Sequence, residues 1–197
     1  MKRLYNNIVK RGLDVLASAS GLVVLSPLYL ILAIVVKSTS KGEIIFRQER
    51  IGKNGKPFII YKFRTMVFDA EKDGPRLSCP DDTRVTSSGR WMRKYRLDEL
   101  PQLWNVLKGD MSFIGPRPER KVYIQEILKE MPEYTKLWEV LPGLSSMGVI
   151  KNGYAKNLDE IMNRSRYDLE YLDDRGFLDD LKILTETLKV IILGRGI

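Results

Sequence analysis

The chain contains no histidine and a single cysteine, Cys79, among its 197 residues. Without histidine and with only one thiol, metal sites built from imidazole and thiolate ligands are excluded, and any general base must come from another side chain. One cysteine also excludes an intrachain disulfide, and without a histidine partner Cys79 is a poor candidate for a reactive thiol. A hard cation held by carboxylate oxygens is the metal chemistry that is left.

Acidic residues are the scarcer charged type, with 25 Asp and Glu against 33 Lys and Arg, which gives a formal net charge of +8. This balance favours anionic partners, namely phosphorylated substrates, nucleic acid or an acidic membrane face. The basic residues are dispersed and no nucleic-acid module is recognisable, so we expect no nucleic-acid partner. A membrane-anchored binding protein with a basic surface is the alternative to an enzyme.

Charge is absent from Val15 to Val36. Roughly 20 apolar residues suffice to span a bilayer, and no clear cleavage site follows the run. Ser26 and Pro27 lie near its middle, where proline should break the helix. Positive charges flank both ends, which fits both ends staying cytoplasmic; these are Lys2, Arg3, Lys10, Arg11, Lys37 and Lys41. We therefore favour a re-entrant helix-break-helix over residues 1–40, with a kinked spanning helix as the alternative.

Residues 41–197 are expected to form a small globular cytoplasmic domain of α+β class, mostly helical, with a β-hairpin. Two β-prone runs, 44–48 and 58–63, flank Asn54-Gly55, a strong hairpin signal. Residues 69–89 are predicted to form a loop, either passive or a mobile lid. Helices are predicted over residues 91–95, from Asp98 onward, and over 118–131, 157–173 (with a cap by Asn157 and Glu160) and 177–193. The apolar face of the last helix fits either core packing or a membrane surface; it comprises Leu178, Leu181, Leu184, Leu188, Ile191 and Ile192.

Two adjacent carboxylates, Asp98 and Glu99, begin a predicted short helix with Pro101 in its first turn. Its buried face is expected to comprise Leu100, Leu103, Trp104 and Leu107. A carboxylate at a helix N-terminus meets unpaired N–H groups and stays ionised, which suits a nucleophile or a metal ligand. Helix capping alone is the alternative role for Asp98. Nearby cations are candidates for gripping phosphate oxygens, or are solvated surface residues; they are Arg93, Arg117, Lys62 and Arg64. Carboxylates beside arginines suggest a phosphoryl-transfer site.

These motifs together resemble the small monotopic phosphoglycosyl transferases of bacteria, the bacterial sugar transferase family. The resemblance covers almost the whole chain, through Lys10-Arg11 and Asp14, Ser26-Pro27, Phe46 to Arg50 with Gly52, Tyr61 to Met66, Leu97 to Leu103, Asn105 to Gly109, and Asp110 to Pro118. A match of this length is highly specific.

The resemblance implies transfer of a sugar-1-phosphate from a UDP-sugar to a polyprenyl phosphate, usually undecaprenyl phosphate, which gives a polyprenyl-diphospho-sugar and UMP. It implies an enzyme that initiates glycoconjugate or polysaccharide assembly on the cytoplasmic face of the bacterial inner membrane, with Mg²⁺ as cofactor. The family's membrane helix breaks at Ser-Pro, which matches Ser26-Pro27, and its catalytic dyad matches Asp98 and Glu99. Asp98 would attack the sugar-bearing phosphorus and form a covalent intermediate, with Asp98 also the candidate metal ligand. Glu99 would orient Asp98 or the incoming phosphate.

One segment departs from the family pattern. Many relatives have a glutamine and a terminal arginine after Pro-Gly, whereas both are absent from residues 144–154 here. The identity of the UDP-sugar is therefore left open. Independently of this segment, the sequence does not specify the pathway, the lipid length or the oligomeric state, including a homodimer. A carboxylate-dependent hydrolase of nucleotide sugars is a further alternative.

Overall fold

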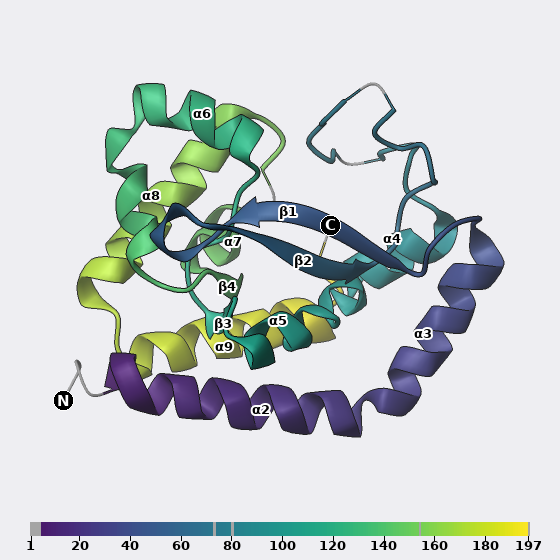
Figure 1. Cartoon of the computed structure of the whole chain (residues 1–197), viewed down its shortest axis with the longest axis horizontal. Coiled ribbons are helices and arrows are strands. Elements are labelled where there is room, and N and C mark those ends of the chain that lie inside the picture. The colour runs from purple at the N-terminus through teal and green to yellow at the C-terminus, as the bar shows by residue number, and fades with distance from the viewer. Residues whose placement is uncertain (1–4, 73, 80, 154, 197) are drawn as a thin grey trace.

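The computed structural model describes residues 5–72, 74–79, 81–153 and 155–196 of the chain. Lys2, Arg3 and Tyr154, which entered the sequence interpretation, lie outside the described residues. Within the described part the fold is mostly helical α+β, as predicted, with two small two-stranded sheets. Figure 1 shows a long N-terminal helix along one edge and a β-hairpin crossing the centre, with the other helices gathered around the hairpin.

The uncharged N-terminal run folds as two helices that meet at an angle. A π-helical turn, η1 (Tyr5–Val9), leads into α2 (Lys10–Val24), and α3 (Ser26–Thr39) follows with a bend of 63°. Pro27 lies in the first turn of α3, where its missing N–H costs little, and it cannot donate to the turn before it. The predicted break at Ser26 and Pro27 is confirmed.

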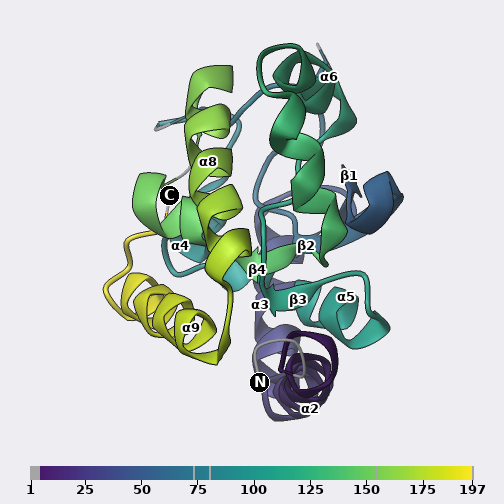
Figure 2. The same cartoon turned by 90° about the vertical axis from the view of Figure 1, so that its left-hand side faces the viewer.

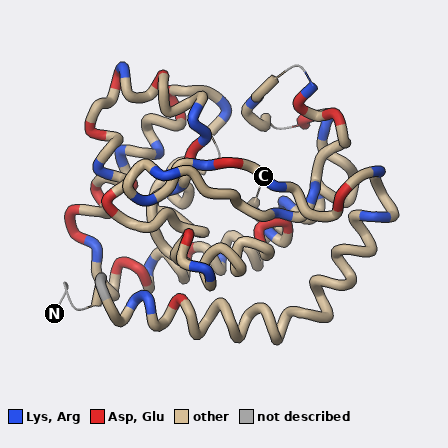
Figure 3. Tube along the Cα trace, in the orientation of Figure 1, with Lys and Arg blue, Asp and Glu red and all other residues tan. Residues whose placement is uncertain are grey.

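Among the described residues, no single helix is long and apolar enough to cross a membrane, whereas α2 and α3 together meet that criterion by length and composition. Figure 3 shows charged residues only toward the two ends of this pair. The bent geometry fits a re-entrant segment, which stays a prediction.

The predicted β-hairpin is confirmed. β1 (Ile45–Ile51) and β2 (Pro57–Phe63) pair antiparallel along their whole length. The connection contains a short helical turn, η2 (Lys53–Gly55), in which Asn54 and Gly55 adopt φ angles of 59° and 69°. Asn and Gly tolerate this left-handed region better than other residues, which explains why the sequence signal was correct.

A second sheet was not anticipated from the sequence. β3 (Ser112–Ile114) and β4 (Gly143–Ser145) pair in parallel. Their approach requires glycine, because a Cβ atom on Gly143 would lie 2.2 Å from the backbone nitrogen of Gly115. Strands of this length carry too little periodicity to be recognised in the sequence. The sheet fixes the start of the turn that carries Arg117.

Helices form most of the remaining structure: α4 (Ser87–Lys94), η3 (Leu97–Glu99), α5 (Gln102–Lys108), α6 (Lys121–Glu130), η4 (Pro132–Glu139), α7 (Met147–Asn152), α8 (Leu158–Asp174) and α9 (Phe177–Ile192). The predicted cap of α8 is confirmed, since the Asn157 side chain accepts a hydrogen bond from the Glu160 N–H at 2.8 Å. α4 begins earlier than predicted, because the Thr86 hydroxyl accepts from the Gly89 N–H at 3.0 Å. α6 begins at Lys121, later than predicted.

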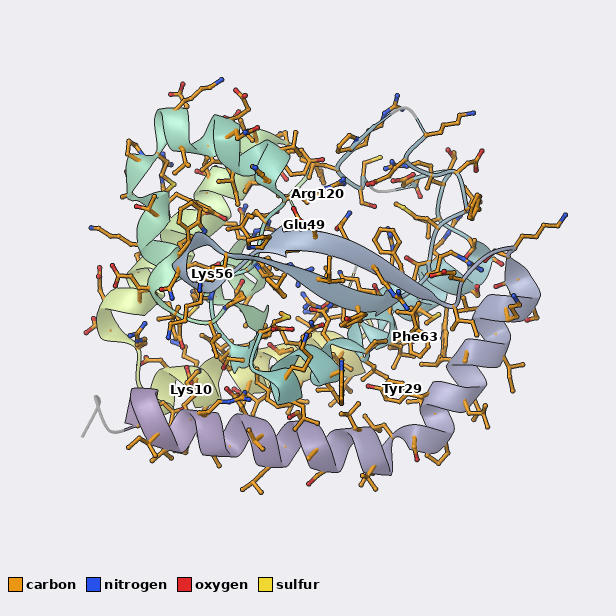
Figure 4. All side chains as sticks on the ribbon, in the orientation of Figure 1. Lys10, Tyr29, Glu49, Lys56, Phe63 and Arg120 are labelled. Carbon is orange, nitrogen blue, oxygen red and sulfur yellow. The ribbon has the colours of Figure 1, made fainter. Side chains whose placement is uncertain are left out.

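The largest hydrophobic core joins α6, η4 and α8; its buried residues are Ile51, Ile124, Ile127, Met131, Tyr134, Leu137, Ala155 and Ile161. A second core packs α3 against β2 and α4, around Leu32, Val36, Phe63 and Met92. In Figure 4 the labelled side chains of Tyr29 and Phe63 meet between α3 and β2, and their ring centroids lie 5.7 Å apart. The second core therefore attaches the N-terminal pair to the rest of the fold.

Polar contacts also fasten the N-terminal pair. Arg11 on α2 donates to the carbonyl oxygens of Val106 and Leu107 at 2.6 and 2.9 Å, the last turn of α5. Asp14 accepts from the Phe113 N–H at 3.0 Å. A cation is favourable at the C-terminal end of a helix, where unpaired carbonyls gather. The orientation of α2 relative to α5 is thereby fixed.

The predicted buried face of α5 was wrong in part, and the structure decides between the two alternatives left open for the apolar face of α9. On α5, Leu103 is buried but Trp104 is 49% exposed, because the helix packs on α2 and β2 through its other side. On α9, Asp180 and Ile183 are buried, whereas Leu178 and Ile192 are 76% and 75% exposed. Core packing therefore does not explain the apolar face of α9. In Figure 2, α2 is seen end-on with α5 and α9 above it on opposite sides.

Candidate active site

The adjacent carboxylates lie in η3, a single helical turn before α5. Arg96 precedes them in the left-handed region, with φ 53°, which redirects the chain after α4. Asp98 and Glu99 are only 7% and 4% exposed. The alternative role of Asp98 as a helix cap is not observed, because α5 begins at Gln102 after Pro101 and no side chain caps η3 or α5. Capping therefore does not account for Asp98.

Glu99 is surrounded by cations. One carboxylate oxygen accepts from Lys62 Nζ at 2.8 Å and from Arg117 Nη2 at 2.7 Å, and the other accepts from Arg96 Nη1 at 3.4 Å. Burial by itself would raise the pKa of Glu99, but the positive charges of Arg117, Lys62 and Arg96 hold it well below its usual range. Glu99 is therefore ionised and held in one position by its partners.

Asp98 is placed differently from its neighbour. Burial raises its pKa, and the charge of Glu99 adds to this, while Lys62, Arg93 and Arg96 oppose it. Among the described residues, no hydrogen bond or ion pair is recorded for its carboxylate, which lines a cavity of about 450 Å³. A carboxylate facing a cavity lined by cations is available to react with, or coordinate, an anionic ligand.

The predicted phosphate-binding residues line the same cavity as the dyad; these are Lys62, Arg64, Arg93 and Arg117. Arg93 donates to Thr65 Oγ1 at 2.9 Å and to Ser78 Oγ at 2.8 Å, which fixes its guanidinium at the cavity wall. Arg64 instead donates to Ser40 and to the Glu43 carbonyl, so its contacts hold the chain that leaves α3.

The turn that carries Arg117 is held from behind by a buried carboxylate. Asp168 on α8 accepts from the Arg117 N–H at 3.0 Å and from the Gly148 N–H at 2.8 Å. Burial raises the pKa of Asp168 to about 6, although both N–H donors lower it. Asp168 thus positions the backbone of Arg117, whose side chain binds Glu99.

Sequence reasoning did not propose several cavity-lining residues as site residues, although Arg47 and Arg50 belong to a motif that carries the family resemblance; the others are Glu119, Arg120, Tyr123 and Arg164. Glu119 accepts from Arg50 Nη1 at 3.2 Å and forms an ion pair with Arg164. Charged residues inside β1 were the available signal for Arg50, since a strand at the centre of a small domain seldom buries charge. Arg164 could not be found this way, because it lies on a helix distant in sequence.

The described side chains provide only some of the ligands that a hard cation needs. Among the described residues, no cluster of three or more His, Cys, Asp or Glu side chains could hold a metal ion. Mg²⁺, however, is commonly bound by one or two carboxylates together with substrate phosphates and water. Glu99 is engaged by its cations, so Asp98 is the carboxylate oriented to contribute such a ligand.

The bacterial sugar transferase family model matches residues 5–194. The chain is 39% identical over 188 residues to a UDP-N-acetylgalactosamine-undecaprenyl-phosphate N-acetylgalactosaminephosphotransferase of Aeromonas hydrophila, which covers 95% of this chain and 44% of that protein. It is 37% identical over 185 residues to a UDP-glucose:undecaprenyl-phosphate glucose-1-phosphate transferase of Klebsiella pneumoniae, covering 93% and 40%.

A protein of Caulobacter vibrioides that carries the same name as the Klebsiella protein is 36% identical over 196 residues, covering 98% of this chain and 73% of that one. The chain therefore spans less than half of the Aeromonas and Klebsiella relatives. The match to the family model nevertheless covers nearly every residue. The chain belongs to the bacterial sugar transferase family.

Proposed function

We propose that this chain transfers a sugar-1-phosphate from a UDP-sugar to undecaprenyl phosphate, giving undecaprenyl-diphospho-sugar and UMP. The observation that carries the proposal is the arrangement around Asp98. This carboxylate faces a cavity in which cations outnumber acids, beside a second carboxylate whose charge is fixed by Lys62 and Arg117. The printed names of the Aeromonas, Klebsiella and Caulobacter relatives support the same reaction class.

The proposed chemistry proceeds in two displacements. A carboxylate oxygen of Asp98 attacks the phosphorus that bears the sugar, and the bond from this phosphorus to the oxygen of UMP breaks. A phosphate oxygen of the lipid then attacks the phosphosugar on Asp98, and the Asp98–phosphorus bond breaks, which restores the carboxylate. Since a phosphate anion is already a nucleophile, no histidine base is required.

The surrounding residues have distinct proposed roles. Arg93 and Arg117 hold phosphate oxygens and stabilise the charge that develops on them. Glu99 keeps Lys62 and Arg117 in place and orients the phosphate against Asp98. Mg²⁺, when bound through Asp98 and the donor phosphates, would neutralise the diphosphate. Arg64 contributes positive charge to the cavity wall, although its hydrogen bonds go to the backbone after α3.

The membrane placement is part of the proposal. We infer that α2 and α3 form a re-entrant pair in the cytoplasmic leaflet of the bacterial inner membrane, with the cavity on the cytoplasmic face. The bend of 63° and the exposed apolar side chains of α2, such as Leu16 and Val23, support this placement. The exposed apolar face of α9 would lie at the interface. The lipid phosphate would then reach Asp98 without leaving the headgroup region.

The test is release of UMP by purified, detergent-solubilised protein incubated with UDP-N-acetylgalactosamine or UDP-glucose, undecaprenyl phosphate and Mg²⁺. We expect lipid-dependent release with one donor, and its loss in Asp98→Asn. The matched control, Asp159→Asn, removes an exposed carboxylate at the start of α8 and should leave turnover unchanged.

Omission of the lipid separates transfer from hydrolysis. The transferase should release about one equivalent of UMP per enzyme and carry a sugar phosphate on Asp98, which intact-protein mass spectrometry would detect. Sustained release without lipid would instead establish a hydrolase. Full lipid-dependent turnover by Asp98→Asn would refute the covalent mechanism.

A further inference from the structure

The cavity extends beyond the dyad to a second group of charged residues. On the dyad side, Arg117 Nη2 donates to Glu99 at 2.7 Å, and on the other side Arg50 Nη1 donates to the Pro118 carbonyl oxygen at 3.1 Å and to Glu119 at 3.2 Å. Because Arg117 and Pro118 are adjacent in the chain, this turn joins the two groups. The cavity thus has a dyad end and a far end, which meet at Arg117.

The far end contains arginine side chains that are largely shielded from water. Glu119 lies between Arg50 and Arg164, and the side chains of Glu119 and Arg164 are 5% and 6% exposed. Burial lowers the pKa of Arg50 to about 10, and the neighbouring arginines lower it further while Glu119 opposes this. One carboxylate lies between two guanidinium groups, of which Arg164 is buried and Arg50 is 17% exposed, and the resulting excess of positive charge is costly without an anionic ligand.

An aromatic wall adjoins this charge. Tyr123 on α6 lines the far end, and the Arg120 guanidinium lies 6.0 Å from the centroid of its ring. Its hydroxyl oxygen is buried and has no hydrogen-bond partner among the described residues. Because an unpaired buried hydroxyl is unfavourable, a ligand that supplies a hydrogen-bond partner is favoured here. Leu77 and Ala155 complete an apolar surface beside the ring.

The loop between β2 and α4 closes this end. Glu71 pairs with Arg120 through two hydrogen bonds of 2.6 and 3.2 Å. This pair joins the loop to the start of α6, and it brings Leu77 to the same cavity as Tyr123. In Figure 4 the labelled Arg120 lies above β1, on the side where α6 begins.

We propose that the far end, formed by Tyr123, Arg120, Leu77 and Ala155, binds the nucleoside of the donor, with the uracil ring against Tyr123. This inference rests on the proposed function. An in-line displacement places the leaving group opposite the attacking atom. The nucleotide must therefore extend from Arg117 away from Asp98, which is toward Tyr123.

Binding of UMP, inorganic pyrophosphate and UDP-N-acetylgalactosamine to the detergent-solubilised full chain tests the assignment by isothermal titration calorimetry. Tyr123→Leu removes the ring and the hydroxyl. We expect its affinity for UMP and for the UDP-sugar to fall about tenfold or more, the size of one base–aromatic stack, with unchanged affinity for pyrophosphate. Tyr167→Leu, on α8 outside the cavity lining, is the matched control and should bind all three ligands normally.

Three outcomes would overturn the assignment. Unchanged UMP binding in Tyr123→Leu would place the nucleoside elsewhere. Loss for the UDP-sugar with normal UMP binding would make this the sugar subsite. Equal losses for UMP and pyrophosphate would indicate a general effect on charge or folding.

Two further measurements keep the test decisive. If Tyr123→Leu does not fold, Tyr123→Phe keeps the ring, and loss of the hydroxyl alone should weaken UMP binding roughly two- to tenfold. UMP binding needs neither lipid nor turnover. A chain that binds UMP in a Tyr123-dependent manner but fails to transfer sugar phosphate would refute the proposed function and preserve the nucleoside subsite.

Discussion

Asp168 is a buried carboxylate whose titration should be measurable in the stability of the whole domain. It is 2% exposed and accepts two backbone N–H groups, from Arg117 and Gly148. Burial raises its pKa from 3.8 to about 6, and the N–H donors and Arg164 offset only part of that rise. Asp168→Asn removes the titration while keeping the shape of the side chain.

The magnitude follows from the shift in pKa. Because the folded protein binds this proton more tightly than the unfolded chain, the contribution is fully present below about pH 4 and is lost as pH rises through about 6. A shift of two units corresponds to roughly 3 kcal/mol. The free energy of unfolding of Asp168→Asn, measured relative to the unaltered chain, should therefore rise by that amount between about pH 4 and 7. For a chain of this size the relative midpoint of thermal unfolding should rise by about 6–12 °C.

The assay is thermal unfolding of the detergent-solubilised chain, followed by circular dichroism across this pH range. The other titrating groups are the same in both chains, so their contributions to the free energy of unfolding cancel when the variant is compared with the unaltered chain. Asp173→Asn removes an exposed carboxylate from the same helix and is the matched control for the substitution itself. If the difference for Asp168→Asn does not change with pH, the reasoning is refuted, because the N–H donors and Arg164 would then fully offset the effect of burial on the pKa.

Two further predictions follow from contacts at or near the site, and a third follows from the positive charges that flank the apolar run. Tyr29→Phe removes the 2.6 Å hydrogen bond from α3 to the carbonyl of Leu100, so we expect kcat to fall with KM for the UDP-sugar unchanged; equal changes in both would exclude a positioning role. Glu99→Gln leaves its three cations with one fewer negative charge, and chemical denaturation should show a loss of about 3–5 kcal/mol. Lys2→Cys in a Cys79→Ser background should resist an impermeant thiol reagent in intact cells, and ready labelling would place the N-terminus outside.

Local chemistry made several elements predictable. Asn54-Gly55 tolerates left-handed backbone wherever it occurs, so the hairpin was correctly predicted. Asn157 caps α8 with an oxygen three residues from its donor, a contact that needs no tertiary structure. Pro27 breaks the apolar run for a reason internal to the helix.

Sequence reasoning was incomplete where segments distant in the chain decide the structure. The apolar face of α9 was compatible with core packing because periodicity identifies a face and not what covers it. Aspartate is a residue type that often caps helices, yet the left-handed backbone of Arg96 and the turn at η3 place Asp98 in the cavity wall. The parallel pairing of β3 with β4 depends on close approach of two glycines far apart in the chain.

The sequence by itself determined the membrane-compatible run with its break, the α+β class, the family resemblance and the pair Asp98-Glu99 with its candidate cations. These depend on composition, on local backbone preference and on contiguous motifs. Only the tertiary structure decided that Lys62 and Arg117 both bind Glu99 rather than Asp98, that Asp168 holds the turn of Arg117, and that Tyr123 and Arg164 share the cavity. The physical reason is that charge pairing and burial depend on distance in space, which residue order does not specify.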